Sequence, residues 1–141
     1  MGKGMPPVQL QIVVIEDNPA DVFLIHEALK EQGLDFALHV IEDGSEGIIF
    51  ARREGKYESG TQPDLIVLDL NLPKHSGKEI LKRLRQSAEL VQVPVAILTS
   101  SDSPQDRLEA FSLGANRYIR KPSDLEEFMQ VGAVLKELLA R

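Results

Sequence analysis

The sequence predicts one α/β domain in which helices cover both faces of a doubly wound, five-stranded parallel sheet. Apolar segments of strand length alternate along the chain with stretches in which apolar residues recur at the helical period. Three of those segments are continuously apolar, which is typical of strands covered on both faces. Repeated strand–helix units close by right-handed crossovers, so the helices come to lie on both faces of one sheet. A length of 141 residues suits one such domain.

Five segments are predicted to be strands because each is short, aliphatic and bounded by polar or turn-forming residues. A polar stretch, REGKYESGTQP (53–63), is predicted to be the loop that leads into the third strand. The five strands are LQIVVIED (10–17), FALHVIED (36–43), DLIVLDL (64–70), VPVAILTS (93–100) and NRYIRK (116–121).

Capping residues predict where the intervening helices begin and end. In two cases a proline directly follows the candidate N-cap, as in a first helical turn. Gly33 and Gly114 are placed where the first and fourth helices should end. The candidate N-caps are Asn18, Ser76, Ser103 and Ser123.

The last helix, SDLEEFMQVGAVLKELLAR (123–141), carries more apolar surface than one face of a sheet requires. Val131, Val134 and Leu138 form a second apolar stripe beside the first. A helix docked on one face needs an apolar arc of roughly 100°, and this arc is about twice as wide. The excess predicts either deeper burial against another helix or a two-fold interface through the fourth helix, fifth strand and fifth helix, and we favour the homodimer. The first stripe consists of Leu125, Phe128, Met129, Gly132, Leu135 and Leu139.

Composition argues against several classes of protein. The net charge is -6 and the 16 Lys and Arg residues are spread along the chain, so no basic stripe is available for nucleic acid. Cysteine is absent, which suits a reducing compartment. No apolar run is long enough for a signal sequence or a membrane span. We therefore expect a cytoplasmic protein with neither nucleic acid nor membrane as a partner.

Three carboxylates, a hydroxyl and an ammonium are predicted to meet at one edge of the sheet. Glu16 and Asp17 end the first strand, and Asp69 ends the third. Thr99 and Lys121 end the fourth and fifth. The carboxyl ends of parallel strands share one edge, where open α/β sheets bind ligands. Two carboxylates about 4 Å apart repel by roughly 4 kcal/mol at an effective dielectric constant of 20, so this cluster should take up protons or a cation.

Magnesium is the cation that best fits such a cluster. It prefers hard oxygen ligands and is typically held by one or two carboxylates together with phosphate oxygens. An aspartate beside it can attack phosphorus and form an acyl phosphate. The residues therefore point to phosphoryl chemistry at this edge.

Four segments carry a resemblance to a known family. VVIEDNPAD, LIVLDLNLPKHSG, AILTSSD and GANRYIRKP resemble, in order and spacing, the receiver domain of two-component response regulators. The resemblance covers the chain from Leu10 to Leu139. It implies a flavodoxin-like sheet with the strand order 2-1-3-4-5.

The resemblance also implies a role for each residue at the sheet edge. Asp69 would be the phosphoacceptor, and Glu16 and Asp17 the acidic pair, with Asp17 the direct metal ligand. The implied cofactor is Mg²⁺, with Mn²⁺ as a substitute. The remaining implied roles are the backbone carbonyl of Asn71 as a metal ligand, Lys121 as the phosphate-pairing lysine, Thr99 as the switch hydroxyl, and Tyr118 as the switch aromatic that swings inward on phosphorylation.

Within that family the opening EDNPAD, the segment DLNLPKHSG and the extended loop before the third strand resemble stand-alone receivers that partner phytochrome histidine kinases of bacteria and cyanobacteria. The expected organisation is a short N-terminal tail (1–9) and a receiver domain (10–141) without an output domain. The expected partner is a sensor histidine kinase of the phytochrome type. Receivers of this kind usually have a cis bond at the position of Lys121–Pro122, so we expect one here.

Other functions remain open at this point. A pseudo-receiver would keep the fold as a docking module without phosphotransfer. A Mg-dependent aspartyl phosphatase of the haloacid-dehalogenase type would need a second aspartate where Asn71 stands. A nucleotide-binding or flavodoxin-like protein would need a phosphate-binding loop in place of EDNPAD. The favoured hypothesis is a switch that catalyses its own phosphorylation and dephosphorylation and is primarily a signalling protein.

Overall fold

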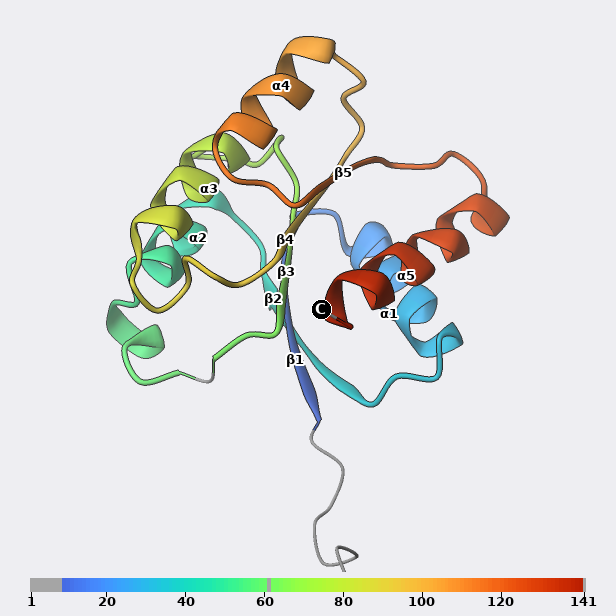
Figure 1. Cartoon of the computed structure of the whole chain (residues 1–141), viewed down its shortest axis with the longest axis horizontal. Helices are drawn as coiled ribbons and strands as arrows, with labels where there is room; N and C mark the ends of the chain where they lie inside the picture. Colours follow the sequence, from blue (N-terminus) through green and yellow to red (C-terminus); the bar gives the residue numbers. More distant parts are fainter. Residues whose placement is uncertain (1–8, 61, 141) are drawn as a thin grey trace, which may run out of the picture.

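A parallel sheet of five strands lies between two layers of helices in the computed structural model, which describes residues 9–60 and 62–140 (Figure 1). The strand order is β2-β1-β3-β4-β5 and each neighbouring pair is parallel, which confirms the predicted doubly wound fold. Each strand lies within the segment predicted for it. The strands are β1 (Leu10–Ile15), β2 (Phe36–Ile41), β3 (Leu65–Leu68), β4 (Val95–Thr99) and β5 (Arg117–Arg120).

The helices are divided between the two faces of the sheet. Figure 1 shows α1 and α5 on one side and α2, α3 and α4 on the other. None of the helices in the described ranges is long and apolar enough to cross a membrane. The helices are α1 (Pro19–Glu31), α2 (Gly44–Ala51), α3 (Gly77–Gln86), α4 (Pro104–Ser112) and α5 (Leu125–Leu139), with a short 3₁₀ helix, η1 (Gly55–Tyr57), in the predicted loop before β3.

Burial of both sheet faces accounts for the continuously apolar strands. Every residue of β3 and β4 is buried. Side chains of a strand alternate between the two faces, so Ile12 and Val14 pack with α1 and α5 while Val13 and Ile15 pack with α2 and α3. The core is thus two apolar layers separated by the sheet, and the polar strand ends are left at its edge.

Local capping chemistry determines most of the helix starts. Three of the four predicted N-caps are confirmed, because the side chains of Asn18, Ser76 and Ser103 accept hydrogen bonds from the first turns of α1, α3 and α4. The prediction for Ser123 is wrong. Asp124 caps α5 instead, accepting a hydrogen bond from the backbone N–H of Glu127 at 2.8 Å. Both residue types are good N-caps, so the sequence alone did not distinguish these neighbours.

The apolar surface of α5 is buried only partly as predicted, with Phe128, Gly132 and Leu135 of the first stripe in the core. Val131, in the second stripe, is 3% exposed and Leu138 is also buried, whereas Leu125, in the first stripe, is 63% exposed. The helix lies close against α1 because Gly132 has no side chain: a Cβ there would lie 2.2 Å from the carbonyl oxygen of Ala28. Val134, the third residue of the second stripe, is half-buried. Deeper burial against α1, one of the two alternatives, therefore accounts for much of the excess, and the homodimer stays a prediction.

The peptide bond between Lys121 and Pro122 also differs from the prediction. None of the peptide bonds within residues 9–60 and 62–140 is cis, so the expected cis bond is wrong. The trans form is intrinsically favoured for X–Pro by about 0.5–1 kcal/mol. Lys121 reaches the carboxylates at the sheet edge with this bond trans, so no isomerisation is needed to direct its side chain there.

Candidate functional site

The carboxylates at the ends of β1 and β3 form one cluster. Glu16 and Asp17 follow the last residue of β1 and Asp69 follows the last residue of β3. Because β1 and β3 are parallel neighbours in register from Ile12 and Leu65 onward, their carboxyl ends meet. One oxygen from each of the three carboxylates lies within 4.8 Å of the others. The acidic cluster predicted from the sequence is therefore present.

Lys121 is the cation of this cluster. It follows β5, and its Nζ lies 2.9 Å from Asp69 Oδ2 and 2.9 Å from Glu16 Oε1. A third carboxylate, Asp21 Oδ2, lies 2.8 Å from the same nitrogen. Asp21 was not among the predicted site residues. Its signal in the sequence is its place in the first turn of α1, three residues after the Asn18 cap, which returns its side chain to the sheet edge.

Burial raises the pKa of Glu16, and hydrogen bonds raise the pKa of Lys121. Glu16 is 2% exposed, and this burial raises its pKa to about 7, with the hydrogen bond from Lys121 opposing the shift and the charge of Asp69 adding to it. Burial alone would lower the pKa of Lys121, but its hydrogen bonds to Asp21, Asp69 and Glu16 outweigh burial and raise the pKa. Lys121 is therefore charged at neutral pH, whereas Glu16 titrates there.

The backbone on either side of Asp69 is held in place. Asp69 is buried, its N–H donates to the carbonyl of Ile15 at 3.1 Å, and its Oδ1 accepts from the N–H of Asn71 at 3.1 Å. The N-terminus of α3 packs on this turn at Gly77, where a Cβ would lie 2.2 Å from the carbonyl oxygen of Asp69. Only glycine permits that approach. The result is a carboxylate with one oxygen paired to Lys121 and the other to a backbone amide.

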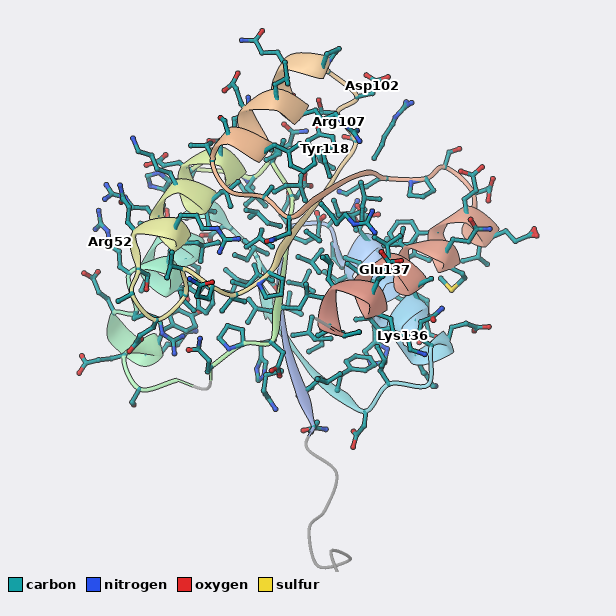
Figure 2. The ribbon with its side chains drawn as sticks, viewed as in Figure 1. Arg52, Asp102, Arg107, Tyr118, Lys136 and Glu137 are labelled. Atoms are coloured by element: carbon teal, nitrogen blue, oxygen red, sulfur yellow. The ribbon has the colours of Figure 1, made fainter. Side chains whose placement is uncertain are left out.

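The residues predicted to form the switch are linked to this turn through hydrogen bonds. Thr99 is fully buried, and its Oγ1 accepts long hydrogen bonds from Asn71 Nδ2 at 3.5 Å and from the Ser101 N–H at 3.4 Å. The Tyr118 hydroxyl donates to the carbonyl of Ser101 at 3.0 Å, and the side chain is only 7% exposed. Arg107 of α4 covers the ring, with its guanidinium carbon 5.2 Å from the ring centroid (Figure 2). Tyr118 is thus turned inward in this structure.

The donor set fits a hard divalent cation. Asp17 and Asp69 offer carboxylate oxygens, and Asp17 is exposed, so an entering ion can reach it from solvent. A cavity of about 250 Å³ opens beside the cluster between α1 and β2. The single ammonium of Lys121 faces three carboxylates, which leaves negative charge that a cation would compensate. Chemically, the site combines a nucleophilic carboxylate with a fixed ammonium and a hydroxyl able to contact the oxygens of a transferred group.

Comparisons with known proteins agree with this geometry. Residues 12–132 match the family described as the response regulator receiver domain. The response regulator Rcp1 of Synechocystis sp. is 36% identical over 120 residues, which are 85% of this chain and 82% of that protein.

Solved structures of related proteins superpose closely. The crystal structure of the phosphorylated cyanobacterial phytochrome response regulator RcpA superposes with a TM-score of 0.86 at 34% identity, covering 94% of this chain and 95% of that one. The Mn²⁺-bound form of Rcp1 superposes with a TM-score of 0.82 at 34% identity, covering 91% and 92%.

Proposed function

The chain belongs to the response regulator receiver domain family, and from that membership we propose that it is a response regulator whose Asp69 accepts a phosphoryl group from a histidine kinase. The observation that supports this most directly is the position of Asp69. Its buried carboxylate contacts the ammonium of Lys121 at 2.9 Å and adjoins two further carboxylates at an edge that is open to solvent through Asp17.

The proposed transfer is an in-line displacement. An oxygen of Asp69 attacks the phosphorus of a kinase phosphohistidine, the P–O bond forms as the P–N bond breaks, and the imidazole leaves with the electron pair of that bond. Lys121 then pairs with a phosphoryl oxygen and the Thr99 hydroxyl donates to another. Mg²⁺ or Mn²⁺, held by Asp17, Asp69 and the Asn71 carbonyl with Glu16 beside them, would neutralise charge on the phosphoryl oxygens.

The output of the switch is proposed to leave through the face formed by α4, β5 and α5. Phosphorylation adds roughly -1.5 to -2 charge and strong acceptor oxygens beside Thr99 and Lys121. Tyr118 is already turned inward, so the proposed effect of phosphorylation is to stabilise that position rather than to create it. A conformational equilibrium of this face would carry the signal to the next protein.

The proposed partner is a sensor histidine kinase of the phytochrome type in the cytoplasm. Support comes from RcpA, which is named as a cyanobacterial phytochrome response regulator, and from its superposition over nearly the whole chain. The proposal also includes a homodimer through α4, β5 and α5. Because Val131 and Leu138 of the second stripe are buried, that interface would depend mainly on Leu108 and Phe111 of α4, both of which are exposed.

Incubation with acetyl phosphate and Mg²⁺ tests the proposal. We expect intact-mass spectra to show the addition of one phosphoryl group to the wild type and none to Asp69→Asn. Labelling of the mutant at the wild-type level would remove Asp69 as the acceptor. A wild type that stays unlabelled, also with a phosphorylated kinase, would favour a pseudo-receiver.

Timed transfer from phosphorylated kinases tests the partner. Phosphorylated phytochrome-type histidine kinases should transfer their phosphoryl group to this protein faster than phosphorylated histidine kinases with unrelated sensor domains do. Equal rates from both sets would contradict the phytochrome partnership and leave the receiver function intact.

A further inference from the structure

Ser101 joins the two switch residues to α4. Its N–H donates to Thr99 Oγ1 at 3.4 Å, and its carbonyl accepts from the Tyr118 hydroxyl at 3.0 Å. Its own hydroxyl donates to Asp106 Oδ2 at 2.5 Å. Every polar group of Ser101 that faces the switch is therefore used, and any displacement of this residue would move the partners of both Thr99 and Tyr118.

Asp106 is in turn held by a lysine from α3. Lys78 Nζ lies 2.6 Å from Asp106 Oδ1 and 3.2 Å from Glu109 Oε2. The hydrogen bond from Lys78 lowers the pKa of Asp106, and the bond to Asp106 raises the pKa of Lys78, so the pair stays charged at neutral pH. Lys78 follows Gly77, which packs directly on the backbone of Asp69. The lysine thus ties the first turn of α4 to a rigid part of the phosphorylation site.

Apolar packing of α4 is too sparse to hold the helix by itself. Ala110 is the one residue in Pro104–Ser112 that is fully buried. Leu108 is 72% exposed and Phe111 is also exposed. Polar contacts with neighbouring elements therefore help to hold α4 in its position.

We propose that Lys78 is a positioning residue for the switch: by clamping Asp106 it holds Ser101 where the latter can orient the Thr99 hydroxyl and keep Tyr118 inward. With both acceptor positions of Thr99 Oγ1 taken by Ser101 and Asn71, the hydroxyl proton is free to be donated to a phosphoryl oxygen. This inference rests on the proposed function of Asp69 and Thr99. It adds a role for α3 that the sequence did not indicate.

Fluorine NMR of fluorotyrosine-labelled protein measures the position of Tyr118 directly. The chain has 2 tyrosines, so two resonances are expected, and Tyr57→Phe assigns them. In Lys78→Met the Tyr118 resonance should shift toward the value of an exposed ring and gain a larger solvent-isotope shift, while the Tyr57 resonance stays in place. Asp106→Asn should reproduce the shift, and adding it to Lys78→Met should change nothing further. Lys78→Arg should restore most of the wild-type signal.

Lys82→Met is the matched control, because Lys82 is an exposed lysine one turn further along α3 and has no ion pair among the described residues. We expect the rate of acetyl phosphate labelling to fall about fivefold in Lys78→Met, the size of a modest coupling energy, and to be unchanged in Lys82→Met. A Tyr118 resonance that stays at its wild-type position in folded Lys78→Met would overturn the proposal, as would an equal shift in Lys82→Met. The NMR measurement needs no phosphorylation, so a failure of Asp69 to become labelled would count against the proposed function and not against Lys78.

Discussion

A charge imbalance dominates the site at the scale of single residues. The ammonium of Lys121 contacts Glu16, Asp21 and Asp69, so one positive charge faces three acidic groups before Asp17 is counted. Burial disfavours ionisation of Glu16 and raises its pKa to about 7. The site therefore holds a proton on Glu16 near neutral pH unless a cation supplies the missing positive charge.

Because Glu16 takes up a proton on folding, we expect the unfolding free energy to depend on pH when no divalent metal is present. The pKa of Glu16 rises from 4.5 in the unfolded chain to about 7 in the folded protein. Protonated Glu16 thus stabilises the fold fully below pH 4.5, and this contribution is lost as the pH rises through 7. Relative to Glu16→Gln, the wild type should lose about 2 kcal/mol of unfolding free energy between pH 5.5 and 8 in urea titrations with EDTA.

Excess Mg²⁺ should shrink that loss, because the ion favours ionised Glu16 and binds more tightly as the pH rises. Parallel pH profiles for the wild type and Glu16→Gln in EDTA would show that Glu16 does not titrate in this range.

Arg85 is the second residue whose contacts predict a measurable effect. Its side chain is half-buried, and its guanidinium reaches from α3 to the loops that lead into β4 and β5. Arg85→Met should lower the unfolding free energy by about 3 kcal/mol, because several carbonyl oxygens would lose their charged donor. Arg83→Met, which removes an exposed arginine of the same helix, should change it by less than about 0.5 kcal/mol. Equal losses in urea titrations would refute this. The acceptors of Arg85 are the carbonyls of Leu90, Val91, Val93 and Gly114 and the side chain of Asn116.

The contact between α1 and α5 illustrates what decides the packing of whole elements. A helical wheel ranks positions by hydropathy, and on that basis α5 has two stripes of similar apolar character. The helix approaches α1 most closely at Gly132, with Phe128, Val131 and Leu135 facing the core and Leu125 facing solvent. Close backbone contact at Gly132 and burial of apolar side chains thus act together on the same face of the helix.

Gly132→Ala tests that contact because two effects oppose each other. Alanine is a better helix former than glycine by about 1 kcal/mol, so propensity alone predicts stabilisation. The added Cβ would lie 2.2 Å from the carbonyl oxygen of Ala28, a backbone atom that cannot move without the helix. We expect the clash to win and the unfolding free energy to fall by about 1–3 kcal/mol. Ala133→Gly, at the exposed neighbouring position, measures the propensity difference alone. A more stable Gly132→Ala protein would contradict this packing.

At the scale of the whole molecule, the helices on the two faces of the sheet differ in how completely they are buried. The α1 and α5 layer covers one side, and α4 lies on the other (Figure 1). α4 is sparsely buried, and its residues Leu108 and Phe111 are exposed. We therefore expect phosphorylation to move elements on the α4 side of the sheet. That side also carries the proposed interface.

Sedimentation velocity tests the proposed homodimer. A dimer should form at high protein concentration and become tighter with a beryllium fluoride phosphoryl mimic, because the switch face and the interface coincide. Leu108→Glu should dissociate it, since it places a charge at an exposed apolar contact. Val91→Glu, an exposed apolar position in the loop after α3, is the control and should leave it intact. A monomer at all concentrations in both states would contradict the dimer.

The sequence by itself determined the order of the elements, three of the helix caps and the identity of the residues at the sheet edge. These depend on local periodicity, on capping chemistry, and on the rule that parallel strands end at the same edge. Once β1, β3, β4 and β5 are parallel, Asp69 and Lys121 must lie near one another, and the structure places them 2.9 Å apart.

Only the tertiary structure decided the contact of Asp21 with Lys121, the inward position of Tyr118 and the buried face of α5. Each depends on neighbours that are distant in sequence. Asp21 needs the first turn of α1 to come within reach of the Lys121 side chain, and α5 needs the carbonyl of Ala28 to meet a glycine. The raised pKa of Glu16 likewise depends on the tertiary structure, because the burial that raises it comes from the surrounding elements and not from its position beside Asp17.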